Sequence, residues 1–312
     1  MHTQPPAPDP VVVRAEAERG RREHFAEFYG REIDGDARLG IVFGNCQAES
    51  LRQTMPSSVD WVRLPPVHEL TADDLPYLDR LLGLADVLIS QPVRDDYHQL
   101  PLGTRQLFSR VRSECATAVI PVIRFAGLYP AQAIVRPPSD ASLTPPVVPY
   151  HDLRTLSEAG GVPLPELTAG ATRAIAALSR EQLRSRESRH GAVPISDVFD
   201  APAFAQMRTI NHPGNVVWTE LALRASDRLA IAGDPTDVGR PLLNSVHAPR
   251  SAAVIDAWQL DEVVSDSWIV GEREVTEAER HRRHIEWYLE NPDVVAAGLA
   301  RHADALRLLA LS

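Results

Sequence analysis

Apolar runs of strand length alternate with helix-compatible segments over the first 125 residues of the chain. The runs typical of buried strands are residues 38–43, 61–64, 86–90 and 116–123. The helical segments between them are residues 47–55, 71–83 and 103–113. Pro121 interrupts the last run, which points to a strand end or an edge strand. Strands that alternate with helices predict an α/β fold with a parallel sheet.

The rest of the chain is dominated by helical patterns. These patterns cover residues 11–30, 166–190, 216–226, 275–290 and 294–311. A proline-rich stretch at 136–149 is too long for an ordinary connection, so a lid, a binding loop and a disordered insertion are its alternatives. The pattern predicts three parts: an N-terminal tail and helix (1–37), an α/β catalytic core that carries the proline-rich loop (38–235), and a mainly helical C-terminal extension packed on the core (236–312).

A cysteine lies where the first apolar run gives way to a helix, in the sequence Gly44-Asn45-Cys46-Gln47. In an open α/β sheet this position is at the carboxyl end of a strand, where ligands bind. The start of a helix lowers a thiol pKa, and its free N–H groups can hold an oxyanion. The alternative is a small buried cysteine under the helix. The amides of Asn45 and Gln47 beside Cys46 favour the reactive role.

The second buried run ends in the same way, with Gln91 and then Arg94 in a polar loop. Gln91 could supply a second oxyanion donor, or its amide could stabilise the turn. Arg94 is a candidate phosphate ligand, although most surface arginines are simply solvated.

The strongest candidate for a general base is His212. It lies in Asn211-His212-Pro213-Gly214-Asn215, and a helix follows. Asparagine and proline are typical of helix starts, so the imidazole is held on a rigid turn. The alternative for His212 is an ordinary surface or capping role, which is the role of most histidines. The chain contains 11 of them.

Composition excludes several classes of protein. The chain has 312 residues and a net charge of −10, and all 32 of its basic residues are arginines. The acidic balance argues against nucleic-acid binding, and the lack of lysine excludes a Schiff-base or P-loop lysine. Two cysteines form no disulfide framework, and no motif typical of a metal site is present. The sequence has no secretory signal and no apolar run that could span a membrane, so we expect a soluble cytoplasmic protein.

Four motifs together resemble one family. Gly44-Asn45-Cys46-Gln47, Ser90-Gln91-Pro92, the segment 125–130 and the His212 turn are similar to the WcbI-type polysaccharide biosynthesis enzymes, over about residues 38–226. The resemblance implies a three-layer core like that of SGNH hydrolases, with a parallel sheet flanked by helices and extra helices at both ends. It also implies a bacterial enzyme of capsule assembly that binds coenzyme A or acetyl-CoA as co-substrate and acetylates a sugar hydroxyl.

The resemblance implies roles for particular residues. Cys46 takes the place of the nucleophilic serine of SGNH hydrolases, and His212 that of their late histidine. Asn45, Gln47, Gln91 and Asn211 would position substrate or hold the oxyanion. Arg94, Arg124 and Tyr129 would bind coenzyme A. The chain lacks a clear Asp-x-x-His, so the third member of a triad stays open.

These residues allow two routes of acyl transfer. Cys46 could become acylated, or His212 could activate the acceptor hydroxyl while Cys46 only positions the thioester. Both routes require Cys46 and His212 to share one pocket. A hydrolase that uses the same residues, and a non-catalytic binding protein, are the alternatives. The C-terminal helices could form a homo-oligomer contact.

Overall fold

The computed structural model describes residues 10–32, 37–137 and 139–311. The chain forms two compact units, and each consists of two segments. Unit 1 contains Met1–Val119 and Ala225–Thr236, and unit 2 contains Ile120–Arg224 and Asp237–Ser312. Of the predicted N-terminal tail and helix (1–37), residues 1–9 and 33–36 lie outside the described residues.

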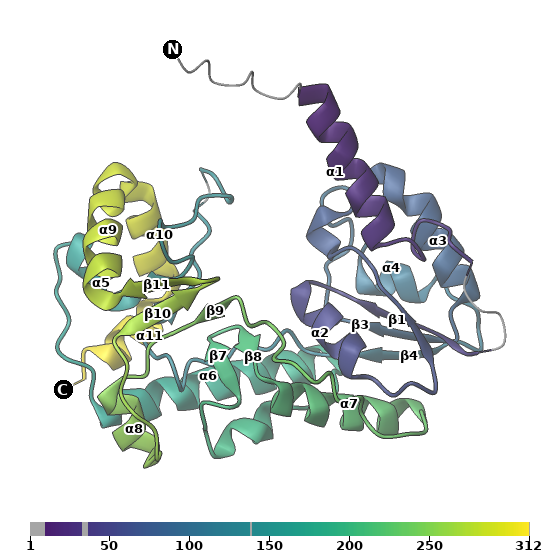
Figure 1. Ribbon diagram of the computed structural model, residues 1–312. Helices are drawn as coiled ribbons and strands as arrows, with labels where there is room; N and C mark the ends of the chain where they lie inside the picture. The colour runs from purple at the N-terminus through teal and green to yellow at the C-terminus, as the bar shows by residue number, and fades with distance from the viewer. Residues whose placement is uncertain (1–9, 33–36, 138, 312) are drawn as a thin grey trace. The chain divides into compact units, whose positions relative to one another are not determined.

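Unit 1 is built on a parallel sheet of four strands in the order β2-β1-β3-β4 (Figure 1). The strands are β1 (Leu39–Phe43), β2 (Asp60–Val62), β3 (Val87–Ser90) and β4 (Ala116–Val119). Every residue of β1 and β3 is buried, which explains their continuous apolar runs. Strand β4 ends just before Pro121, because proline cannot donate to the hydrogen-bond ladder. The predicted α/β class with a parallel sheet is confirmed.

The helices of unit 1 are α1 (Pro10–His24), α2 (Cys46–Thr54), α3 (Leu75–Leu84) and α4 (Thr104–Phe108), with short 3₁₀ turns η1 (Val67–Glu69) and η2 (Ala72–Asp74). Helix α2 contacts β1, and α3 and α4 share the apolar cluster of the sheet, whereas α1 projects away from it (Figure 1). Leu39, Ile41 and Phe43 form one apolar cluster with Leu78, Leu81 and Leu82 of α3. The helix predicted at 103–113 is shorter than expected and ends at Phe108.

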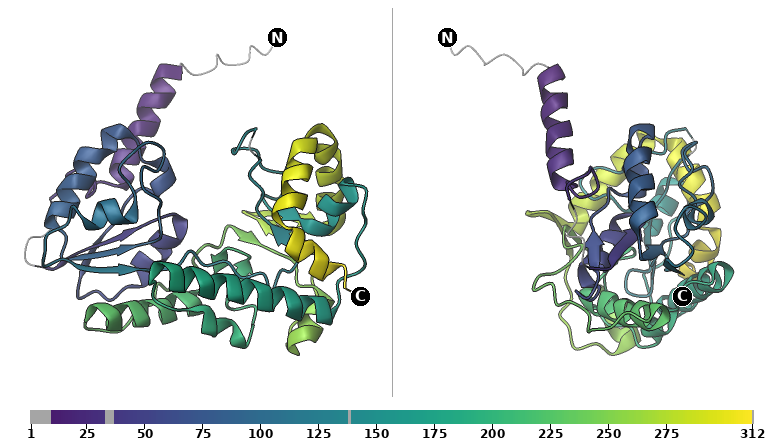
Figure 2. Two further views of the ribbon diagram at one scale, coloured as in Figure 1. Left: turned by 180° about the vertical axis from the view of Figure 1, so that it is seen from behind. Right: turned by 90° about the vertical axis from the view of Figure 1, so that its right-hand side faces the viewer.

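Unit 2 combines helices with small antiparallel sheets. Its helices are α5 (Leu153–Ala159), α6 (Ala169–His190), η3 (Ser196–Asp200), α8 (Ala252–Trp258), α9 (Glu277–Glu290), α10 (Pro292–Arg301) and α11 (Ala303–Leu309). Its strands pair as β5 (Gln132–Ala133) with β6 (His151–Asp152), β7 (Met207–Thr209) with β8 (His212–Pro213), and β9 (Val246–His247) with β10 (Ser267–Val270) and β11 (Arg273–Thr276). The long helix α6 packs against α8 and α11 (Figure 2).

Helix α7 (Asn215–Leu229) begins in unit 2 and ends in unit 1, because the boundary falls after Arg224. The last predicted helix is two helices, α10 and α11, which His302 separates. Within the described ranges, no helix combines the length and the apolar character that a membrane crossing requires.

Candidate functional site

The Cys46 turn is fixed by the amide side chains around it. Cys46 is the first residue of α2, and Asn45 is the N-cap, whose Oδ1 accepts a hydrogen bond from the Gln47 backbone N–H at 2.9 Å. Gly44 belongs here because an added Cβ would lie 2.3 Å from Oε1 of Gln91. The glycine therefore allows the Gln91 side chain to pack closely on the turn.

Gln91 is buried and holds the turn from the neighbouring strand end. Its Oε1 accepts from the Asn45 backbone N–H at 2.9 Å, and its Nε2 donates to Oε1 of Gln47 at 3.3 Å. Both ends of the amide are therefore engaged, which favours the turn-stabilising alternative for Gln91. The Oδ1 of Asn45 caps the helix. The Nδ2 of Asn45 has no hydrogen-bond partner among the described residues, so it is a side-chain donor that could hold an oxyanion at this turn.

The thiol of Cys46 is exposed. Even so, desolvation by the surrounding protein raises its pKa, and hydrogen bonding from the backbone at Gln47 and Cys46 only partly offsets that effect. The expectation that the helix start lowers the thiol pKa is therefore wrong in this resting state. A protonated thiol requires a base before it can act as a nucleophile.

His212 lies in β8, and the predicted helix that follows, α7, begins three residues later at Asn215. Strand β8 pairs with β7, and the Pro213 carbonyl accepts hydrogen bonds from the Trp218 indole at 3.1 Å and from Arg208 at 3.2 Å. An added Cβ at Gly214 would lie 2.0 Å from the Ala205 carbonyl oxygen. Backbone contacts thus fix the position of the His212 main chain.

A tyrosine that the sequence did not single out holds the imidazole. The Tyr150 hydroxyl donates to Oδ1 of Asn211 at 2.8 Å and lies 3.3 Å from Nε2 of His212. The Thr209 hydroxyl donates to the Tyr150 oxygen at 3.0 Å. This network is satisfied when neutral His212 carries its proton on Nε2, which is an assignment from the hydrogen bonds. Nδ1 is then the basic atom, and it is buried with no hydrogen-bond partner among the described residues.

Burial lowers the pKa of His212 to about 4, and the nearby Arg208 and His247 add to this shift. The imidazole is therefore neutral at pH 7, which is the form that can accept a proton. In the described part of the chain, no carboxylate forms an ion pair or a hydrogen bond with His212, so the third triad member stays open.

The other predicted site residues have varied surroundings. Arg94 is exposed, with its guanidinium 6.0 Å from the centre of the Tyr97 ring. Tyr129 is buried and donates its hydroxyl to the Met207 carbonyl at 2.9 Å. Arg124 lines a pocket within unit 2. The structure brings Asn45, Cys46, Gln47 and Gln91 together in unit 1, and Asn211 and His212 together in unit 2.

The fold and the turn define a class: a mixed α/β protein with a cysteine at the carboxyl edge of its parallel sheet. The sequence profile of the family described as polysaccharide biosynthesis enzyme WcbI matches residues 39–234. The chain therefore belongs to the WcbI family of polysaccharide biosynthesis enzymes.

A solved structure of WcbI has a similar fold, with a TM-score of 0.73, 16% identity, and coverage of 88% of this chain and 99% of that one. That structure is described as the native protein without a disulfide bond between coenzyme A and one of its cysteines. No curated protein matches this sequence.

Proposed function

We propose that this enzyme transfers an acyl group, acetyl in the simplest case, from a coenzyme A thioester to a hydroxyl of a sugar or polysaccharide precursor. The observation that carries the proposal is the exposed Cys46 thiol at the first residue of α2. The description of the similar WcbI structure, which names coenzyme A and a cysteine together, supports the choice of a coenzyme A thioester.

In the proposed first step the sulfur of Cys46 attacks the thioester carbonyl, and the thiol proton passes to His212. The tetrahedral oxyanion is held by the backbone N–H at the start of α2 and by Nδ2 of Asn45. Collapse of the intermediate breaks the bond to the coenzyme A sulfur, which leaves as the thiol with the proton from His212. The product is an acyl–Cys46 thioester.

In the second step His212 accepts the proton of the acceptor hydroxyl, whose oxygen attacks the acyl carbon. The new ester forms, the bond to Cys46 breaks, and the thiol regains a proton. In the direct route the acceptor attacks the coenzyme A thioester itself, and no acyl–Cys46 forms. We favour the acylated route, because the exposed thiol has N–H groups beside it.

The variants Cys46→Ala and His212→Gln test the proposal. Because general-base catalysis contributes roughly 100- to 10,000-fold, we expect His212→Gln to lower kcat within that range. Cys46→Ala should abolish the mass increase of an acyl group after incubation with acetyl-CoA. The matched control is Cys115→Ala, because Cys115 is buried against the apolar cluster of unit 1. Full activity of both site variants would contradict the proposal.

The same measurement separates the alternatives. Acyl release without any sugar acceptor would identify a thioesterase that uses water in the second step. Binding of coenzyme A without turnover would identify a non-catalytic binding protein.

A double variant tests whether Cys46 and His212 serve one reaction. If they do, its loss of activity should be no greater than that of the less active single variant. A cytoplasmic location and an oligomer contact through the C-terminal helices stay predictions.

A further inference from the structure

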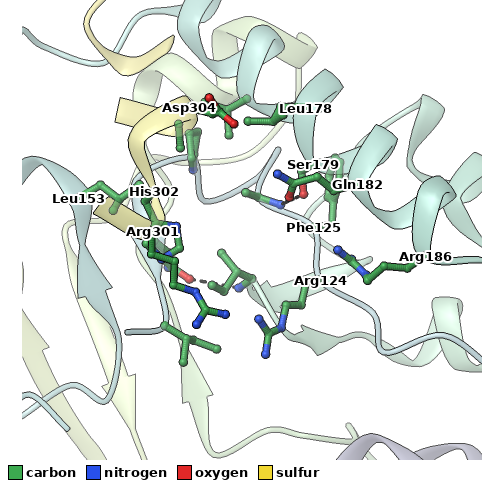
Figure 3. Close-up of a pocket in the computed structure, with 17 residues that line it drawn as sticks. Arg124, Phe125, Leu153, Leu178, Ser179, Gln182, Arg186, Arg301, His302 and Asp304 are labelled. Atoms are coloured by element: carbon green, nitrogen blue, oxygen red, sulfur yellow. Dashed lines mark hydrogen bonds between the residues drawn. The ribbon is translucent and has the colours of Figure 1, made fainter. Parts of the chain in front are cut away.

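A pocket of about 290 Å³ in unit 2 gathers arginines from three distant parts of the chain. Arg124 follows β4, Arg186 lies on α6, and Arg301 ends α10. Figure 3 shows the guanidinium groups of Arg124 and Arg301 directed toward one another, with that of Arg186 directed toward Arg124. Apolar side chains complete the pocket, among them Phe125, Ile134, Leu153, Ile175 and Leu178.

None of the three guanidinium groups has a hydrogen bond or an ion pair with another described residue, and the buried Nη2 of Arg186 has no partner there. The nearby carboxylates are engaged elsewhere. Glu187 accepts hydrogen bonds from the Ile195 and Ser196 backbone, and Asp304 pairs with Arg307.

The positive charges in this pocket repel one another. Burial lowers the pKa of Arg124, and Arg301 and Arg136 add to the effect. Burial and Arg124 likewise lower the pKa of Arg186. His302 also lines the pocket, and its Nε2 is buried with no hydrogen-bond partner in the described part of the chain. Like charges in partly desolvated surroundings cost stability unless an anion binds between them.

We propose that the pocket lined by Arg124, Arg186 and Arg301 is a binding site for the phosphate group of a substrate. A carboxylate would balance one of the three guanidinium charges, whereas a phosphate dianion or a pyrophosphate balances two or more. Guanidinium groups bind phosphate oxygens in bidentate fashion, and the volume exceeds what a single phosphate fills. The apolar residues would contact the carbon part of the same molecule.

The phosphate could belong to coenzyme A or to a phosphorylated sugar acceptor. Only this identification rests on the proposed function, because the charge and the geometry of the pocket point to a phosphate group independently. The test therefore begins with a probe that requires no acyl chemistry.

The probe is inorganic pyrophosphate, titrated into the full-length protein by calorimetry. We expect Arg124→Gln and Arg186→Gln each to weaken its binding by roughly 10- to 100-fold, the loss for one charge-assisted hydrogen bond. The matched control is Arg184→Gln, an exposed arginine on the same helix that pairs with Glu181, and it should bind as the wild type does. Equal binding by all of these variants, or no binding by the wild type, would overturn the proposal.

Thermal unfolding without ligand separates a binding role from a structural one. Arg301→Gln removes one repelling charge, so its melting temperature without ligand should equal or exceed that of the wild type. Pyrophosphate should no longer raise the melting temperature of this variant. Arg301 is exposed, so this variant removes little buried surface. A lower melting temperature together with an undiminished response to pyrophosphate would also overturn the proposal.

Two further titrations identify the molecule that carries the phosphate. Coenzyme A binding more tightly than dephospho-coenzyme A, with the difference lost in Arg186→Gln, assigns the pocket to the 3′-phosphate. Loss of glucose 1-phosphate binding in Arg186→Gln, with coenzyme A binding intact, assigns it to a sugar phosphate. The proposed acyl transfer is tested separately, by whether the mass of the protein increases by one acyl group at Cys46 after incubation with acetyl-CoA.

Discussion

The two turns that carry the candidate chemistry are built differently. The Cys46 turn of unit 1 depends on side-chain amides, since Asn45 caps the helix and Gln91 binds the Asn45 backbone. The His212 turn of unit 2 depends on the backbone, since the Gly214 N–H donates to the Gln206 carbonyl at 2.7 Å and Pro213 accepts from Trp218. The cysteine is exposed at its turn, whereas the imidazole is half-buried behind the Tyr150 hydroxyl.

Despite these differences, desolvation has the same consequence at both turns. It raises the pKa of the Cys46 thiol and lowers that of His212, so each group rests in its neutral form at pH 7. Neither turn therefore holds a preformed ion. In the acyl transfer that we propose, proton transfer would then accompany attack on the thioester, and the basicity of His212 would help to determine the rate.

The largest expected effect follows from the different use of glycine at the two turns. In Gly214→Ala the new methyl group would meet the Ala205 backbone carbonyl, which cannot move without disturbing the β7–β8 pair. In Gly44→Ala it would meet the Gln91 side chain, which can rotate away at the cost of its hydrogen bond to Asn45. We expect losses in the free energy of unfolding of about 3 kcal/mol and about 1 kcal/mol respectively, as measured by urea denaturation.

The control for this pair is Gly83→Ala. Gly83 lies inside α3 with no atom near an added Cβ, so alanine should stabilise the protein by up to about 1 kcal/mol. Equal losses in Gly44→Ala and Gly214→Ala would show that the distinction between side-chain and backbone support is wrong.

Acidification should destabilise unit 2 in particular. Burial lowers the pKa of His284 to about 4, as it does for His212, and both residues belong to unit 2. An unfolded chain binds protons at these residues near pH 6.5 and the folded chain only near pH 4. The folded state therefore loses stability as the pH falls from 6.5 toward 4, by at most about 3 kcal/mol for each histidine.

Tryptophan fluorescence measures this loss, because four of the five tryptophans belong to unit 2 and only Trp61 to unit 1. In His284→Gln the fall in the free energy of unfolding between pH 7 and pH 5 should be smaller than in the wild type. His68→Gln, at an exposed position, should retain the wild-type dependence. An unchanged slope in His284→Gln would contradict the assignment of the loss to His284.

The smallest expected effect concerns the support of the imidazole. Tyr150→Phe removes the hydroxyl beside Nε2 of His212 and should lower kcat by about tenfold with little change in KM, while stability falls by about 1 kcal/mol. Tyr288→Phe is the matched control, since it removes a buried hydroxyl 2.8 Å from His151 in the same unit. An equal loss of kcat in both variants would show that Tyr150 supports unit 2 in general.

The sequence predicts the sheet of unit 1 well, because a buried parallel strand is a continuous apolar run that ends at a recognisable turn. Strand β1, the start of α2 and strand β3 lie where expected. The strands of unit 2 were not predicted, since they contain two to four residues each and several of those residues are exposed. Such short segments carry too few alternating positions for a pattern to emerge.

The site was predictable to the extent that it is local in the sequence. The Cys46 and His212 turns can be recognised in the sequence from the glycine, asparagine or proline at a helix start. Tyr150 and the pocket of Arg124, Arg186 and Arg301 carry no such signal, because segments far apart in the chain bring their partners together. Likewise, desolvation of the Cys46 thiol depends on its surroundings in the folded protein.

The division of helix α7 has a consequence for dissecting this protein. The chain crosses between the units three times, after Val119, after Arg224 and after Thr236, so no single continuous fragment contains the whole of one unit and nothing of the other. A fragment that stops at Val119 would lose Thr236, whose N–H and hydroxyl bind the Thr54 and Met55 carbonyls at the end of α2. Excised pieces should therefore be insoluble or unfolded, and a two-fragment complementation or a circular permutant is the sound way to obtain either half.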